Sequence, residues 1–172
     1  MKKIIIRYGA ISALLISGLM AISTALSSQI GFDNSEIVGY ASLVISFLVI
    51  FFAVRAYYKN NPEVKVAFLK SLSIGLLITL ISSVAYVIVW LILYYTVFPD
   101  FWDKYGAHLV EKLHKSGVAQ SEIDKQVNTL KSYRELYKNP LYNAAFTFME
   151  PLPVGILISL ISAAVIRRSK AS

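Results

Sequence analysis

Four long apolar runs divide the chain, and most of its charged residues lie between them or at the two ends. The runs cover about 4–27, 37–57, 69–98 and 141–166. Each has roughly 20 residues or more, the length that an α-helix needs to cross the hydrocarbon core of a bilayer. Lipid offers no partners for backbone N–H and C=O groups, so runs of this length are expected to be helices. The pattern predicts an all-α, polytopic membrane protein: a single membrane domain over 1–172 with four transmembrane helices.

The first run has a second interpretation, as a secretory signal peptide. Lys2 and Lys3 make its start basic, and Ser-Thr-Ala at 23–25 resembles a small-residue cleavage site. The run is longer than the apolar region of about 7 to 15 residues that is usual in signal peptides, and it contains Arg7. We therefore expect it to remain as the first transmembrane helix.

The link of roughly 40 residues before the last run is too long to be structureless in a compact protein. Apolar residues recur in it at steps of three or four with one longer gap: Trp102, Tyr105, Leu109 and Leu113, then Ile123, Val127, Leu130 and Tyr137. Ser116-Gly117 separates the two stretches, and Ser121 with Asp124 resembles a capping box that opens the second. The link predicts a helical hairpin over about 100–138. Its apolar stripe must be buried against the membrane surface, the ends of the bundle or a partner protein.

Composition agrees with a membrane location. Hydrophobic residues make up 56% of the chain and charged residues 16%, against about 45–50% and about 25% in soluble domains. The chain has no cysteine, which excludes disulfides, thiolate nucleophiles and cysteine-ligated metal sites.

The net charge of +7 is distributed as a topology signal. The link between the first two runs has no basic residue, only Asp33 and Glu36. Basic residues flank the runs at the two ends of the chain and in the middle link: Lys2, Lys3 and Arg7; Arg55, Lys59, Lys65 and Lys70; Arg167, Arg168 and Lys170. Because basic flanks stay in the cytoplasm, we expect both termini to be cytoplasmic and the hairpin to be extracytoplasmic. The expected partner is the lipid bilayer, with anionic lipid at the cytoplasmic face; no nucleic-acid-binding pattern is visible.

Glu150 is the ionisable residue that lies well inside an apolar run. An intramembrane carboxylate is costly and is a candidate functional site. It is followed by Pro151 and Pro153, which remove two backbone donors and predict a kinked or broken helix beside the charge. One hypothesis is an ion or proton site like those at the broken helices of transporters. The other is that Glu150 fixes the packing around a proline kink, since no second buried charge is apparent.

Two large aromatic residues, Tyr86 and Trp90, lie deeper in the third run than the aromatic residues that cluster at its end. We expect their polar atoms to bond to another helix.

Small residues in the last two runs predict a packing seam between helices. They recur at steps of four: Ser71, Gly75, Thr79 and Ser83, then Gly155, Ser159 and Ala163. A hydroxyl-lined path toward Glu150 is the alternative. The segments GLLITLISS (75–83) and GILISLISA (155–163) also match at six of nine positions. This similarity is either the trace of an inverted repeat or the result of a shared packing demand.

Motifs for chemistry are otherwise absent from the sequence. His108, Glu111 and His114 follow each other at steps of three, so the two histidines drift apart around a helix and do not form a zinc pair. A solvated face with a Glu111–Lys115 pair is the better interpretation. We identify no catalytic, cofactor-binding or metal-ligating residue and expect the protein not to be an enzyme.

With its segments laid out, the chain resembles a family of small bacterial inner-membrane proteins that is catalogued as domain of unknown function 4199. The resemblance is carried by EIVGYASLVISFLVIFF (36–52), FLKSLSIGLLITLISS with YVIVW (68–90), PDFWDKYGAHLVEKL (99–113), and YKNPL with FTFMEPLPVGILISLISA (137–163). It covers nearly the whole chain, and Glu-Pro-x-Pro-Val-Gly is its most distinctive part. The resemblance implies four membrane helices with an outer link before the last one, in the bacterial inner (cytoplasmic) membrane.

Two functions follow from these observations. The first is a non-enzymatic structural or interaction component that contacts a protein partner, or a second copy of the chain, through the outer hairpin. The alternative is a small transporter or channel that uses Glu150 in the proline-kinked fourth helix as a proton or ion site.

Overall fold

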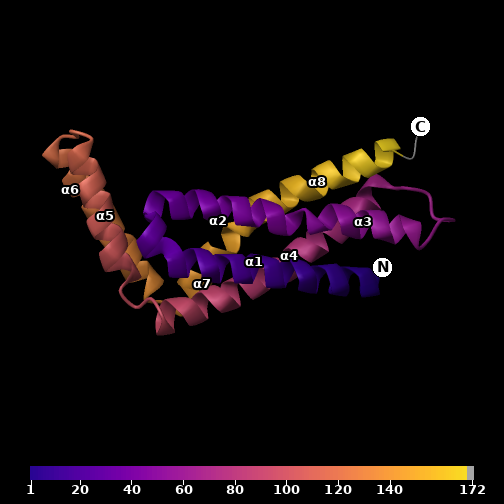
Figure 1. Cartoon of the computed structure of the whole chain (residues 1–172), viewed down its shortest axis with the longest axis horizontal. Helices are drawn as coiled ribbons and strands as arrows, with labels where there is room; N and C mark the ends of the chain where they lie inside the picture. Colours follow the sequence, from indigo (N-terminus) through magenta and orange to yellow (C-terminus); the bar gives the residue numbers. More distant parts are fainter. Residues whose placement is uncertain (170–172) are drawn as a thin grey trace.

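The fold is all-helical in this computed structural model, which describes residues 1–169 without the side chains of residues 27, 28, 30 and 169. No strand occurs in that part of the chain. It contains eight helices (Figure 1): α1 (Lys2–Ile30), α2 (Phe32–Phe47), α3 (Val49–Lys59), α4 (Phe68–Thr96), α5 (Phe101–Lys115), α6 (Gln120–Tyr137), α7 (Pro140–Met149) and α8 (Pro151–Ser169).

Four stretches of helix are long and apolar enough to cross a membrane, as the sequence predicted. They are Lys2–Leu26, Phe32–Lys59, Phe68–Thr96 and Pro140–Arg168. The second begins earlier than the expected residue 37, because Gly31 alone makes the turn from α1 to α2. Gly31 has a φ of 80°, a left-handed conformation that glycine adopts without steric cost. Asp33 and Glu36 therefore lie inside α2 and not in a link.

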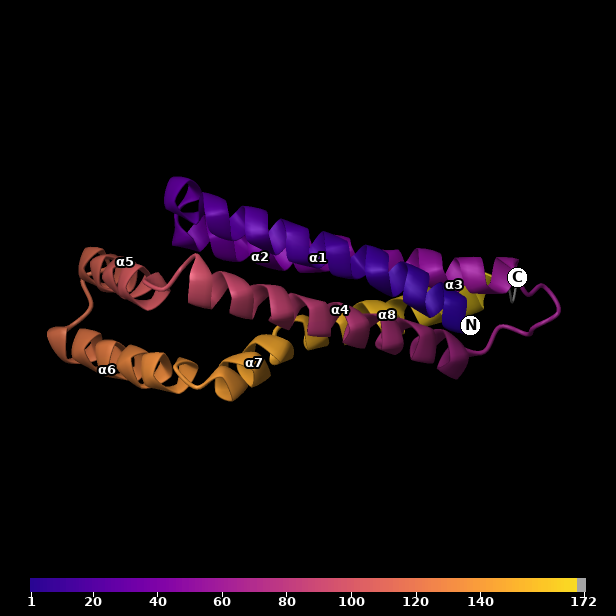
Figure 2. The same cartoon turned by 90° about the horizontal axis from the view of Figure 1, so that it is seen from below.

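The helices form an elongated bundle in which α4 contacts α1, α3, α7 and α8. The N-terminus, the C-terminal part of α8 and the connection over 60–67 lie at one end, which we call the terminal end (Figures 1 and 2). The Gly31 turn lies at the opposite end, the Gly31 end, and α5 and α6 extend beyond it (Figure 2). Lys170 falls outside the described residues.

Between the last two spans, α5 and α6 contact each other along their lengths. Gly117 reverses the chain with a φ of 68°, and Arg134 of α6 donates to both carboxylate oxygens of Asp103 of α5, at 2.6 and 3.0 Å. The predicted capping box at Ser121 is wrong. The N-cap is Ala119, two residues before Ser121, and helix α6 begins at Gln120. Asp124 instead accepts a hydrogen bond from the Gln120 side chain, one turn before it.

Four of the seam residues of α4 and α8 meet across the two helices, Gly75 with Ser159 and Thr79 with Gly155. All of the seam residues are buried: Ser71, Gly75, Thr79, Ser83, Gly155, Ser159 and Ala163. A Cβ added to Gly75 would lie 2.5 Å from the Ser159 hydroxyl, and one added to Gly155 would overlap Thr79. The two helices therefore approach so closely that only glycine fits at these two points.

The similarity between segments 75–83 and 155–163 matches this contact. The segments run antiparallel, so Gly75 meets Ser159 while its counterpart Gly155 meets Thr79, the counterpart of Ser159. Each hydroxyl also donates to the glycine carbonyl one turn back in its own helix, Thr79 to Gly75 and Ser159 to Gly155. A shared packing demand thus explains the likeness, and the hydroxyls are satisfied within their own helices.

Gly75→Ala is expected to destabilise the protein by about 1–3 kcal/mol, because the added methyl overlaps Ser159 in a packed contact. Ser159→Gly in the same chain should restore most of the loss by making room. Thermal unfolding in detergent measures both. Gly18→Ala is the matched control, since a Cβ there meets no heavy atom within 4 Å; equal effects of Gly18→Ala and Gly75→Ala would show that the close contact does not exist.

Candidate functional site

The fourth span breaks at Glu150. Helix α7 ends at Met149, α8 begins at Pro151, and Glu150 lies between them (Figure 2). Proline has no N–H, so Pro151 and Pro153 leave the carbonyls of Thr147 and Met149 without their usual helical donors. The Glu150 N–H donates to the Thr147 carbonyl at 3.4 Å. The sequence thus places a carboxylate at the point where the backbone of this span is least regular.

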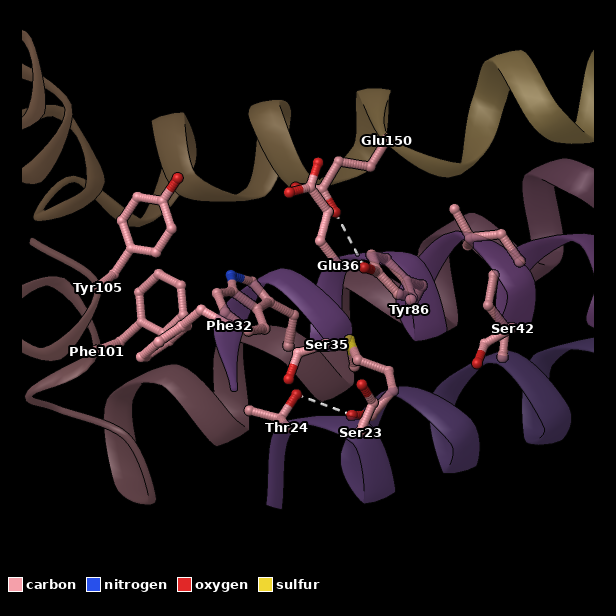
Figure 3. Close-up of a pocket in the computed structure, with 15 residues that line it drawn as sticks. Ser23, Thr24, Phe32, Ser35, Glu36, Ser42, Tyr86, Phe101, Tyr105 and Glu150 are labelled. Carbon is pink, nitrogen blue, oxygen red and sulfur yellow. Dashed lines mark hydrogen bonds between the residues drawn. The ribbon is translucent and has the colours of Figure 1, made fainter. Parts of the chain in front are cut away.

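A tyrosine of α4 holds the Glu150 side chain. The Tyr86 hydroxyl donates to Glu150 Oε2 at 2.9 Å (Figure 3). Both residues lie within candidate membrane spans. The bond holds the Glu150 side chain against α4.

One turn further along α4, Trp90 fixes α7. Its Nε1–H donates to Asn143 Oδ1 at 3.0 Å, and Asn143 also accepts from the Thr147 hydroxyl at 3.3 Å. Asn143 and Thr147 are almost completely buried. The expectation that Tyr86 and Trp90 bond to another helix is therefore confirmed. Together they attach α4 to the fourth span before the break and at it.

Glu36 of α2 lies beside Glu150 in a cavity of about 380 Å³. This carboxylate cavity, as we call it, lies between α1, α2, α4, α5 and the break at Glu150. Figure 3 shows the Glu36 and Glu150 side chains reaching into the same part of it. Glu36 is exposed, so the expectation of no second buried charge beside Glu150 is not contradicted; Glu36 reaches the cavity because α2 begins at Phe32 and carries it a full turn into the helix.

Aromatic rings from three helices wall the end of the carboxylate cavity. Phe32 of α2 packs edge-on against Tyr105 and Phe101 of α5, with ring centroids 5.7 and 6.3 Å apart. Phe101 also packs edge-on against Trp90 of α4 at 5.5 Å. The rings join helix α5 to the bundle at the Gly31 end, and they give the cavity an apolar wall opposite its carboxylates.

No basic side chain occurs among the described residues that line the carboxylate cavity. The cation that comes toward it from α5, Lys112, makes a 2.8 Å contact with Asp33 Oδ1. Asp33, and more weakly Glu36, raises the pKa of the Lys112 ammonium. Lys112 therefore stays charged at neutral pH and remains paired with Asp33. Glu36 and Glu150 are thus not neutralised by an ion pair of their own in the described part of the chain.

The motif His108, Glu111 and His114 does not assemble a site. His108 Nε2 lies 3.4 Å from Asp33 Oδ1, and Glu111 pairs with Lys115 at 2.6 Å. The expected Glu111–Lys115 pair is therefore confirmed, and it lowers the pKa of the Glu111 carboxyl. Within residues 1–169 no group of three histidine or acidic side chains is placed to hold a metal ion.

The apolar stripes expected on 100–138 line a groove of about 410 Å³ between α5, α6 and α7. Trp102, Tyr105, Leu109, Leu130 and Tyr137 contribute to it. Burial, with smaller contributions from Glu150 and two neighbouring tyrosines, raises the pKa of Tyr137 to about 12. Tyr137 therefore remains a neutral group at physiological pH.

The sequence profile of a family described as "protein of unknown function (DUF4199)" matches residues 7–168. The chain belongs to this family. No curated protein and no solved structure is significantly similar to it. The DUF4199 match covers the last three spans, the first span from Arg7 onward and every residue that lines the carboxylate cavity, so the whole site lies within the family's domain.

In this DUF4199 chain two site residues were missed by reasoning from sequence, Glu36 and Asn143. A helical signal for Glu36 was present, because Phe32, Ser35, Gly39 and Ser42 follow the period of one helix face and line the same cavity. For Asn143 the signal was its spacing of four residues from Thr147, which places two polar residues on one face of an apolar helix.

Trp90→Phe is expected to destabilise the protein by about 1 kcal/mol, because the Asn143 amide oxygen loses a donor. A double-mutant cycle with Asn143→Ala, measured by thermal unfolding in detergent, should give a coupling of similar size. Strictly additive losses would show that the two side chains do not hold α4 and α7 together.

Proposed function

We propose that this protein is a small, non-enzymatic membrane transporter or channel whose cation or proton binds in the carboxylate cavity. One observation carries the proposal: two carboxylates, Glu36 and Glu150, share a cavity within the membrane spans with no basic side chain among its described lining residues. Two ionised carboxylates that line one cavity repel each other. A bound proton or cation removes that repulsion, so the cavity favours a positively charged occupant.

The break in the fourth span supports the same role. In broken membrane helices, the carbonyls at the end of a half-helix attract cations, while the break lets one half move against the other. Here the Met149 carbonyl, which loses its usual helical donor at Pro153, directly precedes Glu150, while the Thr147 carbonyl accepts from the Glu150 N–H. This is an analogy of geometry, and it gives Glu150, Pro151 and Pro153 one shared role, in which the prolines create the site that the carboxylate occupies.

The second carboxylate changes the balance between the two functions. A transport path normally needs several polar groups in the membrane. Glu36 supplies a further group, and Tyr86 bonds to Glu150 from a third helix. The interaction role, through a protein partner or a second copy contacting α5 and α6, predicts no effect of a change at Glu150, and the experiment below separates the two.

For the orientation, we propose the bacterial inner membrane with both termini in the cytoplasm and α5 and α6 as an extracytoplasmic hairpin. The basic residues Lys2, Lys3, Lys65, Arg167 and Arg168 belong to the terminal end of the bundle, and basic flanks are retained in the cytoplasm. The carboxylate cavity then faces the outer half of the bilayer, while anionic lipid contacts the terminal end.

Single cysteines test this orientation in a chain that has none of its own. Ser121→Cys on α6 should react with a membrane-impermeant maleimide added to intact spheroplasts, and Glu63→Cys in the 60–67 connection should react only after permeabilisation. Both positions are exposed, Ser121 on α6 and Glu63 in the 60–67 connection. The reverse pattern would contradict the proposed orientation.

Glu150→Gln is expected to reduce proton or alkali-cation flux in proteoliposomes by at least about tenfold, because the amide cannot be ionised. Flux is followed with a pH-sensitive dye and with Na⁺ and K⁺ gradients. Glu63→Gln is the matched control, since the same change is made in the 60–67 connection, away from the cavity. Flux that Glu150→Gln leaves unchanged would overturn the transport role, and so would an unaltered protein that moves neither protons, nor alkali cations, nor organic ammonium cations.

A further inference from the structure

We infer that the carboxylate cavity takes an organic cation, meaning an ammonium group carried on an apolar body, and not a bare metal ion. The inference rests on the proposed function and names its substrate class. It combines four features of the cavity: its volume, its rings, its charge and its second opening.

The volume exceeds what a metal ion needs. The cavity holds about 380 Å³, whereas one water occupies roughly 30 Å³ of liquid. A dehydrated Na⁺, Mg²⁺ or Ca²⁺ ion requires about six or more oxygen atoms converging within roughly 2.0–2.6 Å. Among the described residues no three acidic or histidine side chains converge in that way. A molecule with several heavy atoms therefore fits the space better than an ion alone.

The rings suit a cation of low charge density. Phe32, Trp90, Phe101 and Tyr105 form one wall, and Tyr86 stands beside Glu150. Aromatic faces attract ammonium groups and also cover apolar carbon, which is how proteins recognise quaternary ammonium ligands. A cavity of mainly apolar lining with a few placed polar groups is typical of an organic ligand site.

The charge selects the sign of the ligand. Glu36 and Glu150 approach from two helices, α2 and the break of the fourth span, and Lys112 is already paired with Asp33. An ammonium group between the two carboxylates would have an anionic partner on each side, while its apolar body lies against the rings. A neutral molecule of the same shape gains the ring contacts but no compensation of charge.

A second opening leads toward lipid. A neighbouring cavity of about 270 Å³ shares Glu36, Gly39, Tyr86 and Glu150 with the first and adds Tyr40 of α2. Tyr40 is 56% exposed within a membrane span, so this opening faces the bilayer. Amphiphilic cations partition into membranes, and one dissolved there would reach the carboxylates without crossing water.

Gly39 gives a way to fill the site without disturbing the fold. It lines both cavities, and a Cβ at Gly39 would meet no heavy atom within 4 Å. Gly18 of α1 has the same empty surroundings but does not line either cavity. Gly39→Leu and Gly18→Leu are therefore a matched pair: the same helical substitution, with only one of them placed in the cavity.

The experiment measures binding of benzyltrimethylammonium to the full chain in nanodiscs by tryptophan fluorescence and by calorimetry. Neopentylbenzene, its uncharged isostere, is the ligand control. We expect the cation to bind at least about tenfold more tightly than the isostere. Glu36→Gln and Glu150→Gln should each weaken binding of the cation by at least about tenfold. Gly39→Leu should abolish binding of the cation, and Gly18→Leu should leave it unchanged.

Charge-retaining variants guard against misfolding. Glu36→Asp and Glu150→Asp should bind the cation more tightly than the corresponding Gln variants. Equal binding of the cation and the isostere, binding insensitive to both Gln variants, or binding insensitive to Gly39→Leu would each overturn the inference. If the organic cation does not bind while Glu150-dependent proton or alkali-cation flux persists, the substrate class is wrong and the transport role stands. If both are absent, both fail.

Discussion

The structure depends on how the fourth span meets the requirement that backbone groups be hydrogen-bonded in lipid. Pro151 and Pro153 interrupt that bonding next to a carboxylate, and an interruption of this kind persists in a membrane only where neighbouring helices compensate for it. Within the span the Glu150 N–H donates to the Thr147 carbonyl, and helix α4 bonds to the side chains around the break, through Trp90 to Asn143 before it and through Tyr86 to Glu150 at it. The same helix that stabilises the break thereby determines where its charge points.

The contact between α4 and the fourth span changes from close backbone packing near the terminal end to side-chain contacts near the Gly31 end. Toward the terminal end the two helices meet at Gly75 and Gly155, where no Cβ fits, and the hydroxyls there bond within their own helices. Beyond the break, α7 touches α4 through polar and aromatic side chains, and the space left between α2, α4 and α5 is the carboxylate cavity. Close packing of small residues in one half and separation in the other give a bundle that is tight at one end and hollow near the Gly31 end.

Much of the fold followed from the sequence, because apolar length and small-residue spacing are local signals in a bilayer. The four spans, the interruption at Glu150 and the polar partners of Tyr86 and Trp90 were predictable from spacing and from the chemistry of proline. The companion of Glu150 was not, because the location of Glu36 depends on a turn made by one glycine, and that turn moved the start of α2 by about one helical turn. An N-cap without a capping side chain, Ala119, likewise gave no signal. Local sequence patterns do not show which distant segments lie side by side. The carboxylate cavity is formed by such segments, from α1, α2, α4, α5 and the break at Glu150.

The central claim is that Glu36 and Glu150 share one cavity inside the membrane, and proximity between the two positions tests it most directly. A chain without native cysteine allows the double variant Glu36→Cys/Glu150→Cys to be treated in native membranes with a short, thiol-specific bifunctional reagent. Mass spectrometry should then find peptides containing residues 36 and 150 joined within one chain, and no such link between cysteines at 63 and 150. Failure of positions 36 and 150 to link, while both react singly with a monofunctional reagent, would contradict the account.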